Sequence, residues 1–167
     1  MDELIRYNRE RWEALSSAGV SFGRPWMDLD PVSARQRIDP EGQLQQLSAR
    51  RVLCLAAGGG QQSAAFALLG SLVTVLDFSP NQLDQDRKTA AHYGLPVETI
   101  EGDMRDLSRF ADGSFDIVWL AHSINFIPDV RSLIDQMGRI CAADGMLRMS
   151  FTNPYVHGAW DRFRETG

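Results

Sequence analysis

Apolar residues along this chain gather in short runs separated by amphipathic stretches. The segments 52–57, 71–78, 97–101, 115–121 and 145–151 predict strands, because each is brief, carries apolar residues and is bounded by turn-forming positions. The stretches 61–69, 79–93 and 129–143 predict helices. Strands that alternate with single helices form parallel βαβ units with right-handed crossovers. The pattern therefore predicts the α/β class, with a doubly wound parallel sheet.

The first fifty residues follow a different pattern. Leu4, Ile5, Trp12 and Leu15 fall on one side of a helix that Gly19 ends. Farther on, Asp30-Pro31 predicts the cap and first turn of a short second helix. We therefore divide the chain into an N-terminal helical cap segment at 1–49 and an α/β core at 50–167.

Composition and charge narrow the class of protein. The chain has 167 residues, 44% of them hydrophobic and 23% charged, as is usual for one soluble domain. It has no apolar run long enough for a membrane span and no signal-peptide pattern at its start, so we predict a cytoplasmic protein without a membrane partner. The net charge of −5 argues against a nucleic-acid partner.

The cysteines and histidines give no metal-site pattern. Cys54 falls in a predicted strand and Cys141 in a predicted helix, where we expect both to be small buried hydrophobes. The three histidines stand apart from each other and from the cysteines, so we predict no metal site.

The segment LCLAAGGGQQS at 53–63 joins the first core strand to its helix and raises the question of a ligand. It has no lysine, which excludes a phosphate-binding P-loop. Gly58-x-Gly60-x-x-Ser63 differs from a dinucleotide fingerprint only at its last position, and Asp77 ends the next strand at the right spacing to bind a ribose. On these residues, NAD and S-adenosylmethionine (SAM) fit almost equally well.

Motifs farther along the chain separate the two ligands. Glu101-Gly102-Asp103-Met104 follows the third strand and pairs an acidic with an apolar residue, which suits an adenine amino group and ring face. DGSFDIVWLAHSINFIPD then gives a fourth strand with a histidine at its end. Over roughly residues 50–152 the order of these motifs resembles class I SAM-dependent methyltransferases. The resemblance is to the small-molecule type related to ubiquinone/menaquinone biosynthesis methyltransferases (methyltransferase type 11-like).

The resemblance implies a Rossmann-like core with strand order 3-2-1-4-5, SAM as the cofactor and a role for each motif. Asp77 would bind the ribose hydroxyls, Phe78 would lie against the adenine, Asp103 would bind its amino group and Met104 would cover its ring. Helix capping, core packing and a solvated turn are the alternatives for Asp77, Phe78 and Asp103. Backbone close to the methionine portion of SAM would come from Ala56, Ala57, Gly58 and Gly60.

Further roles come from the same resemblance. Ala121 and His122 would flank the methyl group, and His122 is the candidate general base, ahead of His157. Tyr7 and Arg11 would cover the cofactor, while Trp12 packs. Trp26 and Met27 would line the acceptor cavity.

The chain departs from the family in its first loop. The family usually has an acidic residue and a glycine where this chain has Cys54 and Ala56. Because alanine favours a negative φ, we expect the positive-φ residues of the turn at Gly58 to Gly60. We also expect a larger side chain at Gly58 or Gly60 to occupy the place of the ligand.

The family adds two more strands after the fifth, so we expect a core truncated there. The predicted function is methyl transfer from SAM to a small-molecule acceptor. The alternatives are a SAM-binding module or truncated form without turnover, and an NAD(P)-binding domain. An uncovered fifth strand predicts a homodimer formed through that edge or its neighbouring helices, and an incomplete acceptor pocket predicts slow or absent methyl transfer.

Overall fold

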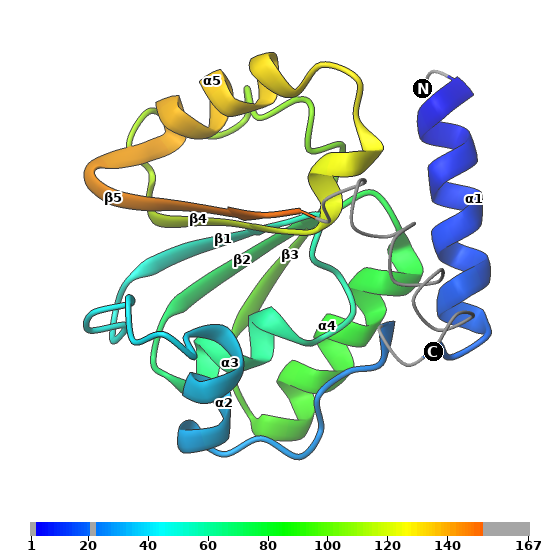
Figure 1. Cartoon of the computed structure of the whole chain (residues 1–167). Coiled ribbons are helices and arrows are strands. Elements are labelled where there is room, and N and C mark those ends of the chain that lie inside the picture. Colours follow the sequence, from blue (N-terminus) through cyan, green and yellow to red (C-terminus); the bar gives the residue numbers. More distant parts are fainter. Residues whose placement is uncertain (1–2, 21–22, 152–167) are drawn as a thin grey trace, which may run out of the picture.

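The apolar runs of the core pair as neighbouring parallel strands. The computed structural model describes residues 3–20 and 23–151 (Figure 1). Within them, a five-stranded sheet has the order β3-β2-β1-β4-β5. The strands are β1 (Arg51–Leu55), β2 (Leu72–Asp77), β3 (Val97–Glu101), β4 (Phe115–Ala121) and β5 (Cys141–Ser150). All neighbours run parallel, so the predicted fold class and strand order are confirmed.

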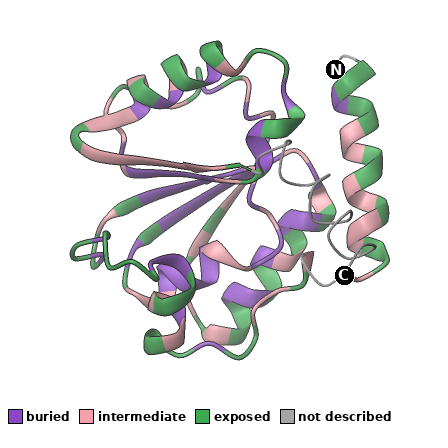
Figure 2. Cartoon of the chain, in the orientation of Figure 1, coloured by how far each residue is buried: buried purple, intermediate pink, exposed green. Residues whose placement is uncertain are grey.

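Alternating side chains of the strands fill two cores, one on each face of the sheet. Val52 and Cys54 of β1 belong to the cluster under α2 (Pro31–Ile38) and α3 (Gln62–Leu68). Leu53 and Leu55 belong to the cluster under α5 (Val130–Ile140). Figure 1 shows α5 on one face and α2, α3 and α4 on the other, and Figure 2 shows the central strands as mostly buried. The strictly two-residue period of a strand explains this division.

Local signals fix the ends of the helices. Asp30 caps α2 and Ser79 caps α4 (Pro80–Tyr93), and in both cases proline follows as the first helical residue. Gly94 ends α4 with a left-handed φ of 65°. These ends lie where the sequence predicts them. None of the helices in residues 3–20 and 23–151 has the length and apolar character needed to cross a bilayer.

The last helix and strand differ from the prediction. Helix α5 ends at Ile140, three residues before the predicted end, and β5 begins at Cys141, four residues before the predicted start. A bulge between Phe115 and Ile117 lets the early part of β5 pair with β4. Cys141 therefore lies in a strand and only partly buried, so its expected place as a buried helical residue is wrong, whereas Cys54 is fully buried.

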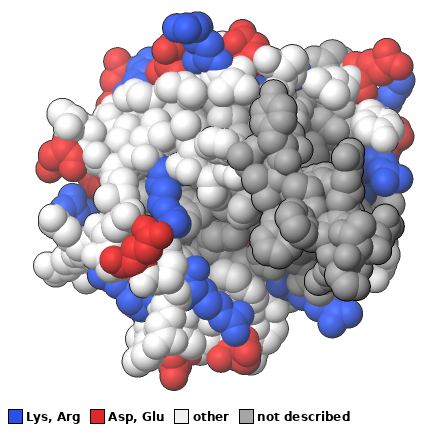
Figure 3. Space-filling view, in the orientation of Figure 1, with Lys and Arg blue, Asp and Glu red and all other residues white. Residues whose placement is uncertain are grey.

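Strand β5 forms one edge of the described sheet. It pairs with β4 on one side, and its residues from Gly145 to Ser150 are partly exposed. The Arg148 guanidinium lies 4.3 Å from the centre of the Trp119 ring and donates to the Ile38 carbonyl. In Figure 3 the area around β5 is largely uncharged, while acidic and basic side chains surround it.

Helix α1 (Glu3–Ser17) stands across the carboxyl ends of the strands (Figure 1). The Asn8 side chain donates to the Phe126 carbonyl over 3.2 Å, and Arg9 forms an ion pair of 3.0 Å with Glu101. These contacts hold α1 over the strand ends, where open α/β sheets bind their ligands.

Candidate functional site

The turn after β1 is strained at an unexpected residue. Ala56 has a φ of +43°, while Gly59 and Gly60 have +123° and +70° and Gly58 lies outside the left-handed region. The Ala56 amide donates to the Leu76 carbonyl over 2.8 Å, and the Ser123 hydroxyl donates to the Ala56 carbonyl over 2.7 Å. These bonds hold alanine in a conformation that costs about 1–2 kcal/mol. The expectation that glycines alone take the positive φ angles is therefore wrong.

Two positions of the turn have no room for a side chain, because helix α4 lies against them. A Cβ on Gly60 would stand 2.2 Å from Thr89 Oγ1 and 2.8 Å from the Gln85 carbonyl oxygen. A Cβ on Gly58 would stand 2.5 Å from the Gln82 Cβ. A larger side chain at Gly60 would thus strike α4, which corrects the expectation that it would take the place of a ligand, whereas one at Gly58 would also meet Asp77 on the cavity wall. Gly60 does not line the cavity described next, whereas Gly58 does.

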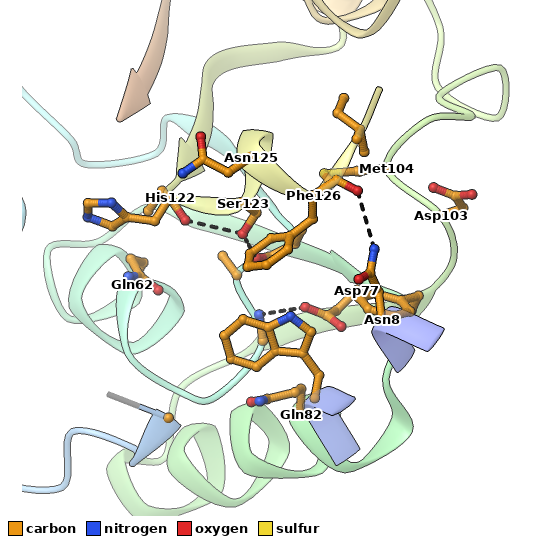
Figure 4. Close-up of a pocket in the computed structure, with 18 of the residues that line it drawn as sticks. Asn8, Gln62, Asp77, Gln82, Asp103, Met104, His122, Ser123, Asn125 and Phe126 are labelled. Carbon is orange, nitrogen blue, oxygen red and sulfur yellow. Dashed lines mark hydrogen bonds between the residues drawn. The ribbon is translucent and has the colours of Figure 1, made fainter. Parts of the chain in front are cut away.

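A cavity of about 350 Å³ lies at the carboxyl ends of β1, β2 and β4, beneath α1 (Figure 4). Its size is within the range of small-molecule sites. The described residues that line it come from every segment around the strand ends: Ile5, Asn8, Trp12, Gly23, Ala56, Ala57, Gly58, Gln61, Gln62, Asp77, Phe78, Gln82, Asp103, Met104, Ala121, His122, Ser123, Asn125, Phe126 and Ile127.

Asp77 lines this cavity, and the residue is only 5% exposed. One oxygen accepts from the Gly58 amide over 3.0 Å, and the other accepts from the Ser79 amide over 2.9 Å. Burial raises the pKa of Asp77 to about 6, although these amide hydrogen bonds lower it. Each oxygen keeps a lone pair for a further donor, so the link to Ser79 and a ligand contact are compatible.

The segment after β3 places an acidic and an apolar residue on the cavity wall. Asp103 accepts from the Arg105 amide over 2.9 Å and from its Nε over 2.8 Å. Met104 is buried and joins the core cluster under α5. Met104 therefore supplies an apolar surface, while Asp103 shares its carboxylate with Arg105. Figure 4 labels Asp103 and Met104 in the cavity wall.

The end of β4 is shaped by a second strained residue. His122 has a φ of +62°, its amide donates to the Ser150 carbonyl over 2.8 Å, and its side chain is exposed at the cavity. The hydroxyl of Ser123 lies 2.7 Å from the Ala56 carbonyl oxygen and 3.2 Å from that of Ala121. One hydroxyl thus links the ends of β1 and β4, beside the two strained residues.

Helix α1 reaches the cavity with different residues from those predicted. Ile5, Asn8 and Trp12 line it, because positions three, four and seven apart share one face of a helix. The ring of Trp12 meets Phe126 edge to face at 5.8 Å. Tyr7, which is 60% exposed, and Arg11 do not line the cavity.

Other predicted residues also lie away from the cavity. Trp26 is partly buried and packs against the core, the Arg37 guanidinium lies 4.9 Å from its ring centre, and Met27 is exposed. Neither lines the cavity. His157 falls outside residues 3–20 and 23–151, which the structure describes.

The sequence analysis assigned no role to several polar lining residues. Gln61, Gln62, Gln82 and Asn125 are among them. Gln82 is 3% exposed, and its Oε1 accepts no hydrogen bond within the described part of the chain. The sequence contained a signal for Gln82. Polar residues recur at helical spacing on the side of α4 that faces inward, namely Ser79, Gln82, Asp86 and Thr89.

Comparisons with known proteins identify the family of this chain. A family model described as "Methyltransferase domain" matches residues 53–149, more than half of the chain. The chain belongs to this methyltransferase family. The resemblance to class I SAM-dependent methyltransferases is thereby confirmed.

Individual relatives agree with that membership. The chain is 40% identical over 174 residues to the uncharacterized methyltransferase YbaJ of Bacillus subtilis, covering 93% of this chain and 65% of YbaJ. It is 29% identical over 130 residues to a ubiquinone biosynthesis O-methyltransferase of Xanthomonas oryzae, covering 78% of this chain and 53% of that protein. This chain therefore spans about half to two thirds of the length of these curated relatives.

A solved structure shows the same fold. The PH0226 protein of Pyrococcus horikoshii superposes with a TM-score of 0.68 at 25% identity, covering 86% of this chain and 68% of that one.

Proposed function

We propose that this chain binds SAM in the cavity at the strand ends and that the protein transfers its methyl group to a small-molecule acceptor. The observation that carries the proposal is the position of Asp77. Its buried carboxyl group faces the cavity between the glycine turn and the Asp103-Met104 segment. Family membership supports the same cofactor.

The lining residues fit the parts of this cofactor. Asp77 has free lone pairs for two ribose hydroxyls, and Phe78 and Met104 offer apolar surface to a base. The unpartnered Oε1 of Gln82 is a second buried acceptor in the same cavity. A buried acceptor without a donor costs about 1–3 kcal/mol, which a hydroxyl or ammonium group of the ligand would recover.

Methyl transfer from SAM requires the protein mainly to position the reactants and to exclude water. SAM supplies a methyl group on a sulfonium, which is already a good leaving group. Ile5, Asn8 and Trp12 of α1 exclude water from the strand ends, and Ala57 and Gly58 let backbone approach the ligand closely. His122, exposed at the cavity, would remove a proton from an acceptor that carries one at neutral pH.

A small molecule is the acceptor class that we propose. The relative from Xanthomonas oryzae is a ubiquinone biosynthesis O-methyltransferase, and the cavity of about 350 Å³ is within the size range of small-molecule sites. Incubation with SAM labelled in its methyl group, followed by fractionation of a cell extract, tests this. Even slow transfer would place label in a low-molecular-weight compound other than SAM itself, separated from unreacted SAM by chromatography. Label in nucleic acid or protein alone would contradict the proposal.

A further inference from the structure

A buried carboxyl group on α4 holds the glycine turn from outside the cavity. Asp86 is 0% exposed and does not line the cavity. Its Oδ2 accepts from the Gly59 amide over 3.0 Å, and its Oδ1 accepts from the Gly60 amide over 3.1 Å. The Ser63 hydroxyl at the start of α3 donates to Oδ1 as well. Three donors from the turn and the following helix therefore converge on one side chain.

The packing of the turn depends on the same helix. The Gly59 amide also donates to the Gln82 carbonyl over 3.1 Å, one turn before Asp86. Thr89, one turn after it, lies where a side chain on Gly60 would be. Gly59 and Gly60 thus rest on three successive turns of α4, with the Asp86 carboxyl in the middle. This contact fixes where Ala57 and Gly58, the next residues back along the chain, face the cavity.

We infer that Asp86 is a positioning residue of the cofactor site, acting through the backbone of Gly59 and Gly60. The inference rests on the proposed function of the cavity. An ionised carboxylate accepts hydrogen bonds only, so it matches three converging donors, whereas a protonated carboxyl group adds a donor that the Ser63 hydroxyl can accept only by giving up its own donation to Asp86. The conformation of the turn is therefore tied to the charge on Asp86.

The surroundings of Asp86 make that charge sensitive to pH. Burial raises the pKa of Asp86, Ser63 and the two amides lower it, and the charge of Asp77 on β2 raises it; together these effects give a pKa of about 7. Cys54 on β1 is the other titratable group that faces it, and Asp86 contributes to raising the pKa of that thiol. Ligand affinity should therefore fall as the pH drops through about 7, by up to tenfold per pH unit for a single proton.

The test compares two buried carboxyl groups that each hold loop backbone. Asp39 accepts from the amides of Gln43 and Leu44 over 2.7 and 3.0 Å, is 7% exposed and does not line the cavity. Calorimetric titration with S-adenosylhomocysteine at pH 8 and low temperature should give at least tenfold weaker binding for Asp86→Asn. Asp39→Asn should stay within twofold of the parent. A folded Asp86→Asn protein that binds as the parent does overturns the inference.

A pH profile and amide exchange separate positioning from plain stability. The step near pH 7 in the affinity of the parent should be absent in Asp86→Asn. The amides of residues 58–62 should exchange faster in Asp86→Asn than in the parent. Their exchange rates in Asp39→Asn should equal those of the parent. If the parent binds neither SAM nor S-adenosylhomocysteine, the proposed function fails, and the exchange rates alone decide on Asp86.

A milder variant applies if Asp86→Asn does not fold. Ser63→Ala removes one of the three donors, so it should raise the pH at which affinity declines and speed exchange of the same amides. No shift and no change in exchange would overturn the inference.

Discussion

At the scale of single residues, the charge of Asp77 is subject to two opposing effects, burial and hydrogen bonding. Its carboxyl group fixes the Gly58 and Ser79 amides and also faces the cavity, yet the residue is almost fully buried. Burial favours its neutral form, whereas ribose hydroxyls and the amides favour the charged one. A ligand that donates to Asp77 therefore stabilises the charge that burial opposes.

We predict that Asp77→Ala weakens binding of S-adenosylhomocysteine by about 1.5–3 kcal/mol, the range for hydrogen bonds to a charged group. Asp103→Ala should cost less, because its partner on adenine is a neutral amine and its carboxylate is already shared with Arg105. Isothermal titration of both variants measures the difference. Parent-like binding by Asp77→Ala would mean that the ribose lies elsewhere.

The same carboxyl group gives a pH dependence of defined sign. The pKa of Asp77 is about 6 in the folded protein and 3.8 in the reference state, so the folded state retains a proton that the unfolded chain releases. The contribution of this group to the free energy of unfolding is greatest below pH 4 and is lost as the pH rises through about 6, by on the order of 3 kcal/mol.

Asp77→Asn removes that titration. Its stability relative to the parent should therefore increase between pH 4 and pH 7 in urea unfolding of the ligand-free proteins. A relative stability that stays constant or decreases over this range would contradict the assignment.

At the scale of elements, the glycine turn and α4 form one packed unit. Strand and helix positions were predictable because the apolar runs and the caps at Asp30, Ser79 and Gly94 are local signals. The left-handed Ala56 was not predictable, since it is held by bonds from Ser123 and to Leu76, far away in sequence. Most cavity residues at the strand ends were also predictable, because they follow predicted strands in the sequence. Which residues of α1 line the cavity, and that Gly60 contacts α4, were not predictable, because both depend on tertiary packing.

Gly60→Ala should reveal this packed unit. The new methyl group would clash with Thr89 and take an unfavourable φ, so we expect a loss of roughly 2–4 kcal/mol in unfolding free energy. Gly42 is the matched control, because it has a φ of +68° with nothing within 4 Å. Gly42→Ala should cost only about 1 kcal/mol. Equal losses in the two variants would show that α4 does not constrain the turn.

At the scale of the whole molecule, the backbone edge of β5, the last strand of the described sheet, is a surface that suits a second copy. Its residues after Gly145 are apolar apart from Arg148 and Ser150, and Phe151 beyond them is 63% exposed. An edge strand with unpaired backbone groups and few charges is a template for pairing with another chain. We propose a two-fold dimer of the 167-residue chain through this edge.

Light scattering behind a sizing column tests the dimer at tens of micromolar protein. Phe151→Lys should shift the equilibrium towards monomer, because it places a charge beside the paired edge. Ile134→Lys, on the exposed side of α5, is the matched control and should leave the dimer unchanged. A parent chain that elutes as a clean monomer would contradict the proposal.

The central claim is that the cavity between the glycine turn, Asp77 and Met104 binds the sulfur nucleoside cofactor of the family. Calorimetric titration of the parent chain with S-adenosylhomocysteine, SAM and NADH, each in a separate experiment, tests it most directly. We predict saturable heat at one site per chain with S-adenosylhomocysteine and SAM, and none with NADH. Heat with NADH and none with either sulfur nucleoside would contradict the claim.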